Sequence, residues 1–337
     1  MILTPLPYKN TSLFYHNQLK TSTPMTDFSK TQVNWDNFKC RCSGIHKIMA
    51  NGKGKSALSE KQLEELKLLK MKLDLGKTFT ENQKQRFAEL TLREDSPAKY
   101  PFGDTCIEYL GEVYALQKYG MVPVGKEVEL EQLQKGRLAE ADSISLLSFV
   151  DDAFYSKNEE RIENDFLIGE PDIFNGEEIM TSDKIIDVKN SFDMPGFIKK
   201  INAPILGANK LQVQGYMDIT GAKNGEIAHV LVSMPLIMQI EMRKRLFFKG
   251  DYATEENAEF KMRWEILERS MNFDHVPPRE RVFKIKVEPF TKEEQTKLYD
   301  KVKMCRDWLY EFDEMHSNMN KNLDGTVPHR TLDEKIV

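Results

Sequence analysis

The sequence predicts an α/β fold in which a mixed central sheet is flanked by helices. Two short apolar runs each carry an aspartate, Asp172 and Asp187, and the turn signal Asn175-Gly176 lies between them. This order favours a β-hairpin. Two later apolar runs, 228–234 and 281–287, predict a further strand and an edge strand. Amphipathic segments before, between and after these runs supply the helices.

The second apolar run carries a lysine two residues after its aspartate. Residues i and i+2 of a strand share one face, so Asp187 and Lys189 project together while Val188 points into the core. The hairpin would place Asp172 beside Asp187. Two carboxylates and an ammonium on one face need a partner that offsets their charge cost, and a divalent cation is the usual one. The short pattern alone is equally compatible with the solvated ends of ordinary strands.

The flanking segments add further polar groups at helical spacing. Residues 131–149 predict an amphipathic helix that contains Gly136 and Glu140, and Glu140 could add an oxygen ligand or hold a metal-bound water. Downstream, Gln212 and Tyr216 lie on one face of a second predicted helix. An amide and a hydroxyl would therefore reach the site together.

These four elements, taken in order, resemble the PD-(D/E)XK nuclease superfamily. The order Gly136-x-x-x-Glu140, Pro171-Asp172, Asp187-x-Lys189 and Gln212-x-x-x-Tyr216 is similar to the RecB-type and phage lambda exonuclease (YqaJ-like) branch. The segment 212–214, followed by 220–222, is especially similar to the YqaJ-type viral recombinase nucleases. The resemblance implies a restriction-endonuclease-like core.

The resemblance also implies an activity and a cofactor. The expected reaction is metal-dependent hydrolysis of DNA phosphodiester bonds, as a duplex-end exonuclease of phage-type recombination. Mg²⁺, or Mn²⁺ in its place, would be held by Asp172, Asp187 and the backbone carbonyl of Val188, with Glu140 completing the shell. The family suggests a single-strand annealing protein as partner.

The remaining residues of the motif would act on the reacting groups. Lys189 would position the attacking water and stabilise the phosphate in the transition state. Gln212 and Tyr216 would orient the lysine, the water or the DNA strand. Two alternatives remain open: an endonuclease or defence nuclease of the same fold, and a non-catalytic DNA-binding protein that keeps the fold.

The chain divides by composition. Residues 1–31 are polar and predicted to be flexible, and 32–316 are predicted to form the nuclease domain. Within that domain, 59–92 predict an inserted helical hairpin, since two capping boxes each precede an amphipathic segment, and 238–316 form a C-terminal extension. Residues 317–337 are predicted to be a disordered tail. The added segments leave the oligomeric state, the polarity of digestion and the choice between exonuclease and endonuclease open.

The net charge of -5 argues against bulk coating of nucleic acid, but a local basic groove remains compatible with it. Residues 190–209 predict a basic loop beside the site, and 238–250 hold the densest basic cluster. Ser43 is also predicted to cap a helix that starts near Ile45. Each candidate DNA contact can equally be an ordinary surface group; the candidates are Arg41, Ser43, Arg137, Ser191, Lys199, Lys200, Lys210 and Gln214.

Composition predicts a water-soluble protein of a reducing compartment. Hydrophobic residues make up 40% of the chain and charged residues 30%, without an apolar run long enough to span a bilayer. Four cysteines in a chain of this length do not predict a disulfide framework, and Cys40-x-Cys42 lacks zinc-knuckle spacing. We expect no secretion signal, no membrane partner, and a cytoplasmic location, in a bacterial host cell if a phage encodes the chain.

Overall fold

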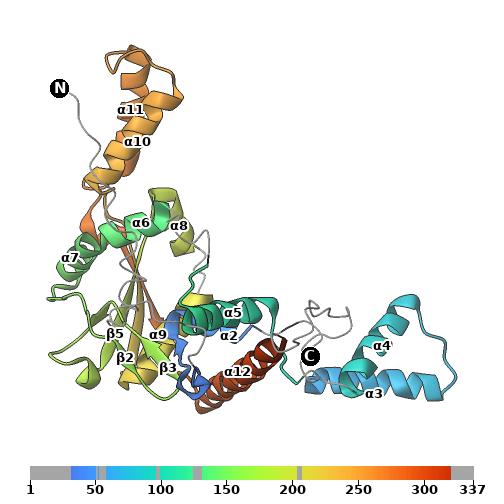
Figure 1. The fold of residues 1–337 in the computed structure, drawn as a ribbon. Coiled ribbons are helices and arrows are strands. Elements are labelled where there is room, and N and C mark those ends of the chain that lie inside the picture. Colours follow the sequence, from blue (N-terminus) through green and yellow to red (C-terminus); the bar gives the residue numbers. More distant parts are fainter. Residues whose placement is uncertain are drawn as a thin grey trace. The chain divides into compact units, whose positions relative to one another are not determined.

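The computed structural model describes residues 32–50, 52, 58–95, 99–123, 131–202 and 207–319. The predicted flexible segment 1–31 lies outside these residues, and so does most of the predicted tail 317–337; residues 317–319 are described and helical, so the predicted start of the tail is wrong. The chain divides into two compact units. Figure 1 shows the fold with colours that follow the residue number. The first unit contains Lys118–Ile162 and Gly169–Pro289, and the second contains Val33–Gln117, Glu163–Ile168 and the segment from Phe290.

The first unit is built on a mixed sheet of four strands within the described residues. The order is β4-β5-β6-β7, where β5 and β6 run parallel and the two outer strands run antiparallel to their neighbours. This arrangement confirms the mixed sheet that the sequence predicts. The strands are β4 (Ile173–Phe174), β5 (Lys184–Asn190), β6 (Asn224–Val230) and β7 (Val282–Val287).

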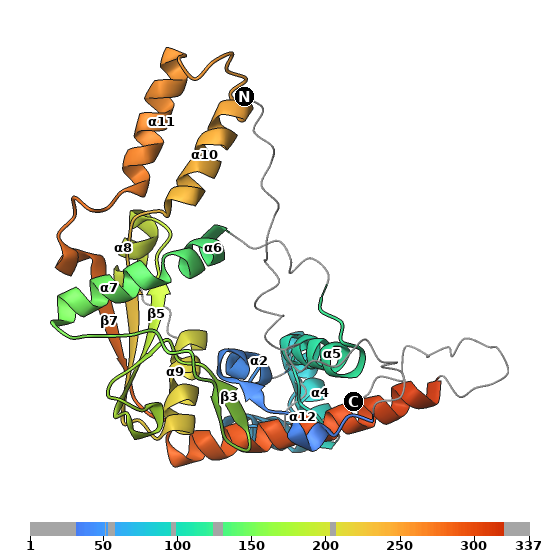
Figure 2. The ribbon, with the colours of Figure 1, turned by 60° about the vertical axis from the view of Figure 1, so that its left-hand side comes forward.

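Helices cover both faces of this sheet (Figures 1 and 2). On one face α7 (Glu140–Asp151) packs Ile144 and Leu147 against Ile186 and Ala228. On the other face α9 (Gly207–Thr220) packs its apolar side chains against β6 and β7; the cluster contains Val213, Met217, Ile227 and Val287. Because side chains alternate along a strand, Asp187 and Lys189 lie on the α9 face.

Two predicted boundaries are wrong. The predicted helix 131–149 is two helices, α6 (Glu131–Leu138) and α7, separated at Ala139. Ala139 occupies the N-cap position of α7, and its carbonyl accepts a hydrogen bond from the Ser143 hydroxyl at 2.8 Å. The predicted strand 228–234 begins earlier, at Asn224, because β6 pairs with the whole of β5.

The predicted loop 190–209 is also wrong, because α8 (Met194–Asn202) forms within it. Pro195 and Gly196 suggest a break in the sequence, but proline is tolerated in the first turn of a helix. The Asp193 carboxylate accepts a hydrogen bond from the Gly196 N–H at 2.7 Å. Phe197 then anchors α8 to the sheet, since it is buried beside Leu231.

A pair of helices, α10 (Leu236–Lys249) and α11 (Ala258–Met271), separates β6 from β7 in the sequence. They lie side by side in Figures 1 and 2. Met238 and Met271 form a buried cluster at the base of the pair, and Phe192, which follows β5, packs against that cluster. The basic segment 238–250 therefore lies mostly on α10. Two short 3-10 helices complete this unit, η4 (Ile179–Thr181) and η5 (Pro278–Arg281).

The second unit is mainly helical. Trp35 stacks on Tyr114 with ring centroids 5.4 Å apart, and both side chains donate to the Asp313 carboxylate, at 3.4 and 2.8 Å respectively. β1 pairs in parallel with β3 in a small sheet of order β1-β3-β2. The elements are η2 (Trp35–Asn37), β1 (Cys40–Arg41), η3 (Cys42–Gly44), α2 (Ile45–Ile48), α3 (Glu60–Asp74), α4 (Glu81–Asp95), α5 (Asp104–Tyr119), β2 (Ile162–Glu163), β3 (Leu167–Gly169) and α12 (Lys292–Met319).

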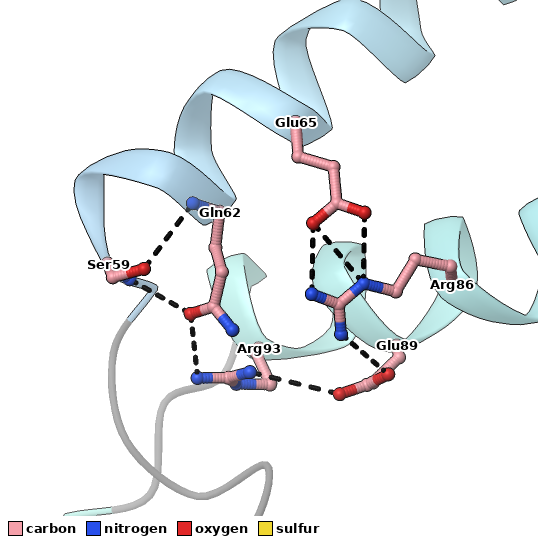
Figure 3. A network of polar contacts seen from close by, with 6 residues as sticks. All are labelled: Ser59, Gln62, Glu65, Arg86, Glu89 and Arg93. Atoms are coloured by element: carbon pink, nitrogen blue, oxygen red, sulfur yellow. Dashed lines mark hydrogen bonds and ion pairs between the residues drawn. The ribbon is translucent and has the colours of Figure 1, made fainter.

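Helices α3 and α4 form the predicted hairpin, and both predicted capping boxes are present. Ser59 Oγ accepts the Gln62 N–H at 3.4 Å, and Gln62 Oε1 accepts the Ser59 N–H at 3.0 Å (Figure 3). Thr80 and Gln83 make the same reciprocal pair at 3.3 and 3.2 Å. These bonds satisfy N–H groups that a helix start leaves without partners.

The two helices of the hairpin are also joined by a charged pair and a small apolar core. Arg86 on α4 forks onto the Glu65 carboxylate on α3, with nitrogen–oxygen distances of 2.9 and 3.1 Å (Figure 3). Leu66 and Leu90 are buried between the helices.

In the described part of the chain, no helix combines the length and the apolar character needed to cross a membrane.

Gly225 on β6 provides a test of the packing beneath the site. A Cβ atom there would lie 2.5 Å from Met217 Sδ, 2.7 Å from Val213 Cγ1 and 3.2 Å from the Val287 carbonyl oxygen. Gly225→Ala should lower the free energy of unfolding by about 1–3 kcal/mol, because overpacking displaces α9. Urea denaturation measures this. Gly136→Ala is the control, since open space surrounds that position, and an equal loss in both variants would contradict the packing account.

Candidate active site

The pairing of β4 with β5 brings the two predicted aspartates together. Ile173 lies opposite Ile186, so the register places Asp172 opposite Asp187. Asp172 Oδ2 accepts the backbone N–H of Val188 at 2.7 Å, which fixes its carboxylate against the strand. The predicted hairpin is thus present, although its connection is longer than an Asn-Gly turn and includes η4.

A buried asparagine holds the segment that carries Asp172. Asn158 is only 5% exposed, and its amide donates to the Pro171 carbonyl at 2.9 Å. Its backbone N–H donates to the Asp172 carbonyl, also at 2.9 Å. The sequence does not reveal this role, because Asn158 lies in a polar connector without a motif.

Four side chains form a continuous polar chain on the α9 face of the sheet. Lys189 Nζ lies 3.0 Å from Asp187 Oδ1 and 2.8 Å from Oδ2. The same ammonium donates to Gln212 Oε1 at 3.3 Å, and Gln212 Nε2 donates to the Tyr216 hydroxyl at 2.8 Å. The i, i+4 spacing on α9 therefore presents the amide to the lysine and the hydroxyl to the amide.

Burial sets the charge behaviour of the two aspartates. Burial and the negative charge of Asp187 together raise the pKa of Asp172 to about 7, against the opposing effects of Lys189 and the Val188 N–H. Burial likewise raises the pKa of Asp187, against the attraction of Lys189. Burial alone would lower the pKa of Lys189, but the two carboxylates outweigh it and raise that pKa. One ammonium does not fully offset two carboxylates at this depth.

Glu140 lies at the start of α7 and is paired elsewhere. Its Oε2 accepts a hydrogen bond from Lys157 Nζ at 2.7 Å, and it affects Asp172 only as a weaker, more distant charge. Within the described residues, no group of three or more His, Cys, Asp or Glu side chains is close enough to hold a metal ion. The structure therefore brings Asp172 and Asp187 together and leaves Glu140 outside their immediate contact.

The two aspartates nevertheless suit a hard cation. Asp187 is 0% exposed, and its Oδ2 has no hydrogen bond in the described structure, because the nearby lysine lacks hydrogen-bond geometry to that atom. Lys189 supplies only one positive charge for the two aspartates, and the remaining negative charge is costly at this depth unless a further cation neutralises it. Asp172, whose pKa is raised by burial and by Asp187, gains from the same neutralisation. Oxygen donors of this kind match Mg²⁺ or Mn²⁺.

The candidate DNA contacts lie in varied environments. Lys199 and Arg137 are exposed, Lys200 and Lys210 are half-buried, and Ser191 is fully buried. Gln214 is 3% exposed and donates to the Glu288 carbonyl at 3.0 Å, which is a structural contact. The other two candidates, Arg41 and Ser43, belong to the second unit.

The predicted cap at Ser43 is wrong. Ser43 is exposed within η3, and Gly44 occupies the N-cap position of α2 without a side-chain bond. A Cβ atom at position 44 would lie 3.0 Å from the Tyr109 ring, a tight contact that favours glycine there. A serine at the cap position would meet that ring.

Two buried basic residues near the site have no sequence motif. Lys135 on α6 is 0% exposed, and its Nζ donates to the carbonyls of Ser191 and Phe192 at 2.8 and 3.0 Å. Burial lowers its pKa to about 8. His229 on β6 is 3% exposed and pairs in register with Lys189. Both depend on contacts between distant segments, which residue spacing does not show.

Comparisons with known proteins support the fold. No protein-family model matches this sequence, and no curated protein matches it either. Among solved structures, the chain is similar to a phage-related exonuclease from Haemophilus somnus 129PT, with a TM-score of 0.51 and 20% identity, over 84% of this chain and 97% of that one. An alkaline exonuclease from Laribacter hongkongensis gives a TM-score of 0.47 and 11% identity, over 85% and 94%. The first likeness shows that this chain shares the fold of the Haemophilus somnus protein.

The raised pKa of Asp172 predicts an unusual dependence of stability on pH. Its folded pKa of about 7 exceeds the ordinary value of 3.8, so the folded state holds more protons than the unfolded state between these values. The free energy of unfolding should therefore fall as pH rises from about 5 to about 8 in EDTA. Urea denaturation across this range measures it.

In Asp172→Asn, most of that decline should disappear, because the titrating carboxyl is gone. Glu159→Gln, which changes an exposed carboxylate in the same unit, should keep the decline of the wild type. An Asp172→Asn variant with the same slope as the wild type would show that Asp172 does not titrate in this window.

Proposed function

We propose that this protein is a metal-dependent nuclease that hydrolyses DNA phosphodiester bonds. The observation that carries the proposal is the contact between Asp187, Lys189 and Gln212, with Asp172 opposite Asp187 in the sheet register. Carboxylates for a hard cation and an ammonium beside them are what phosphodiester hydrolysis requires. The Haemophilus somnus protein of the same fold is a phage-related exonuclease, which supports the proposal.

The two aspartates would hold Mg²⁺ or Mn²⁺ together with the backbone carbonyl of Val188. When bound, the cation supplies charge neutralisation at the phosphate and a lowered pKa for the attacking water. Glu140, whose Oε2 is engaged by Lys157, would act on this shell through water. In this proposal two carboxylates would bind the cation directly and one would support them.

Lys189 would act on the reacting groups themselves. Its ammonium lies beside Asp187 and is held from the other side by Gln212, so its position is fixed before substrate binds. An ammonium in that place stabilises the negative charge that develops on the phosphate and orients the water. Tyr216 fixes the Gln212 amide through the 2.8 Å bond and thereby limits how the lysine can move.

The finer proposal is a duplex-end exonuclease of phage-type recombination that works with a single-strand annealing protein. Its support is the resemblance of the motif order to the YqaJ-like branch. An endonuclease of the same fold would cut covalently closed circles, whereas an exonuclease requires an end. A protein that only binds DNA would degrade neither form.

The activity test uses linear and covalently closed circular duplex DNA with magnesium. The wild type should degrade the linear form, and Lys189→Ala or Asp187→Asn should reduce the initial rate by at least about 100-fold. Lys286→Ala and Asp183→Asn are matched controls, since both change exposed residues of the same sheet region and should leave the rate unchanged. Variants that cut as fast as the wild type would refute the site assignment.

Metal binding can be measured without any reaction. In EDTA-treated protein, Mg²⁺ or Mn²⁺ at about ten times its Kd should stabilise the wild type by about 1.4 kcal/mol. Asp187→Asn should lose this gain, because it removes one of the two buried ligands, while Asp183→Asn should keep it. Thermal denaturation with and without the ion gives the comparison, and equal gains in all three proteins would place the ion elsewhere.

A further inference from the structure

A second ammonium lies next to the proposed site and has no part in the chemistry above. Lys200 is in the last turn of α8, and its Nζ donates to Ser191 Oγ at 3.1 Å. The same nitrogen lies 3.5 Å from the carbonyl oxygen of Asn190. Asn190 and Ser191 directly follow Lys189, so α8 returns a positive charge to the carboxyl end of the strand that carries the catalytic lysine.

The charge of Lys200 is offset only in part, by the Asp193 carboxylate, which forms no ion pair with it among the described residues. Other lysines of this unit form ion pairs, as Lys157 does with Glu140 and Lys189 with Asp187. Lys200 is half-buried, and across the described residues it bonds to uncharged oxygens and forms no ion pair. Burial and the positive charge of Lys189 lower its pKa. A half-buried cation of this kind favours the binding of an anion.

The imidazole of His229 adds an unpaired polar group to the same place. His229 is 3% exposed and lies beside Lys189 in the parallel register of β5 and β6. Its Nδ1 has no hydrogen-bond partner among the described residues. Burial, with Lys200 and Lys189, lowers the pKa of His229 to about 4, so the ring is neutral near pH 7 and keeps one N–H to donate.

The turn that carries these groups is held in place from two other helices. Lys135 on α6 donates to the carbonyls of Ser191 and Phe192, and the Asn190 amide donates to Ser143 Oγ on α7 at 2.8 Å. Ser191 is itself 0% exposed, so it positions the Lys200 ammonium and does not meet solvent. The charge is therefore fixed in place before any ligand arrives.

We propose that Lys200, positioned by Ser191 and adjacent to His229, forms a second phosphate-binding subsite beside Lys189. The subsite takes the phosphodiester next to the bond that is cleaved, so the substrate is a strand with at least two consecutive linkages. This inference rests on the proposed function and deepens it. The proposal assigns different roles to two adjacent lysines, because Lys200 is half-buried against Asn190 and Ser191 whereas Lys199 is exposed.

The test measures binding of the full chain to short DNA duplexes in EDTA, where hydrolysis does not interfere. In each duplex one phosphodiester near the end is replaced by a neutral methylphosphonate, and the replacement moves by one linkage at a time. Lys200→Gln removes the charge and keeps a polar side chain that is slightly shorter. Lys199→Gln is the matched control on the same helix, and circular dichroism establishes that both variants fold.

Lys200→Gln should weaken binding to the unmodified duplex by about tenfold, as expected for one charge-assisted contact. On the duplex whose neutral linkage occupies the subsite, the wild type should weaken to the same degree, and Lys200→Gln should cause no further loss. Lys199→Gln should cause a small loss that does not depend on linkage position. Ser191→Ala keeps the charge of Lys200 but removes the hydrogen bond that positions the ammonium. It should therefore cause a smaller loss of affinity, dependent on the same linkage.

Equal losses of affinity in Lys200→Gln and Lys199→Gln would overturn the subsite. So would a result in which Lys200→Gln weakens binding further on every modified duplex, whichever linkage is neutral. If Lys200→Gln does not fold, the Ser191→Ala loss decides the question, and a loss spread over all linkages overturns the proposal. In either case a wild type that still cleaves DNA leaves the proposed function standing. A wild type that neither binds nor cleaves DNA overturns both.

Discussion

A fully buried carboxylate, Asp187, and a partly buried one, Asp172, lie near a single ammonium on the central sheet, and the surrounding structure is arranged around that charge imbalance. Asp187 is inaccessible to solvent and contacts Lys189 through both oxygens, yet one of those oxygens lacks a hydrogen bond. Asp172 meets the same strand through the Val188 N–H. Buried like charges oppose folding unless something offsets them. The arrangement is therefore hard to explain as a stabilising feature of the fold and easy to explain as a cation site.

The supporting contacts all restrict motion near these groups. Asn158 fixes the backbone on both sides of the Pro171-Asp172 bond, and Gln212 and Tyr216 restrain Lys189 from α9. Gly225 lets α9 approach the sheet closely, because any side chain there would meet Val213 and Met217. Each contact removes a degree of freedom that the reaction would otherwise have to restrict. The fold thus fixes the geometry of the site before substrate binds.

The sequence predicts local periodicity well and long-range contacts poorly. The spacing of Asp187 and Lys189 on a strand, and of Gln212 and Tyr216 on a helix, follows from repeats of 2 and 3.6 residues, and the structure confirms both placements. Capping boxes at Ser59 and Thr80 depend on neighbours three residues away and are equally visible. The strands and helices followed from the same periodicities, whereas their restriction-endonuclease-like arrangement was implied by the resemblance.

The missed features depend on packing between distant segments. The helix α8 was hidden because Pro195 and Gly196 suggest a loop, while its stability comes from Phe197 packing on a strand that lies far ahead in the chain. Glu140 was predicted inside a single helix and lies at the start of α7, and spacing cannot show that Lys157 engages its carboxylate. Asn158 and His229 have no motif at all, and only the folded chain shows what surrounds them.

The distribution of charge along β5 links the two proposed functions of this strand. Its middle carries Asp187, opposite Asp172, where negative charge exceeds positive; its end carries Lys189 and receives Lys200, where positive charge exceeds negative. A cation and a phosphate are attracted to opposite ends of this gradient, and Lys189 lies at the boundary. A phosphodiester that meets the cation with one oxygen and Lys189 with another would place its neighbouring linkage toward Lys200. The direction in which the DNA strand lies across the site would then be set by the charges on the sheet. It would need no contact between the protein and the bases.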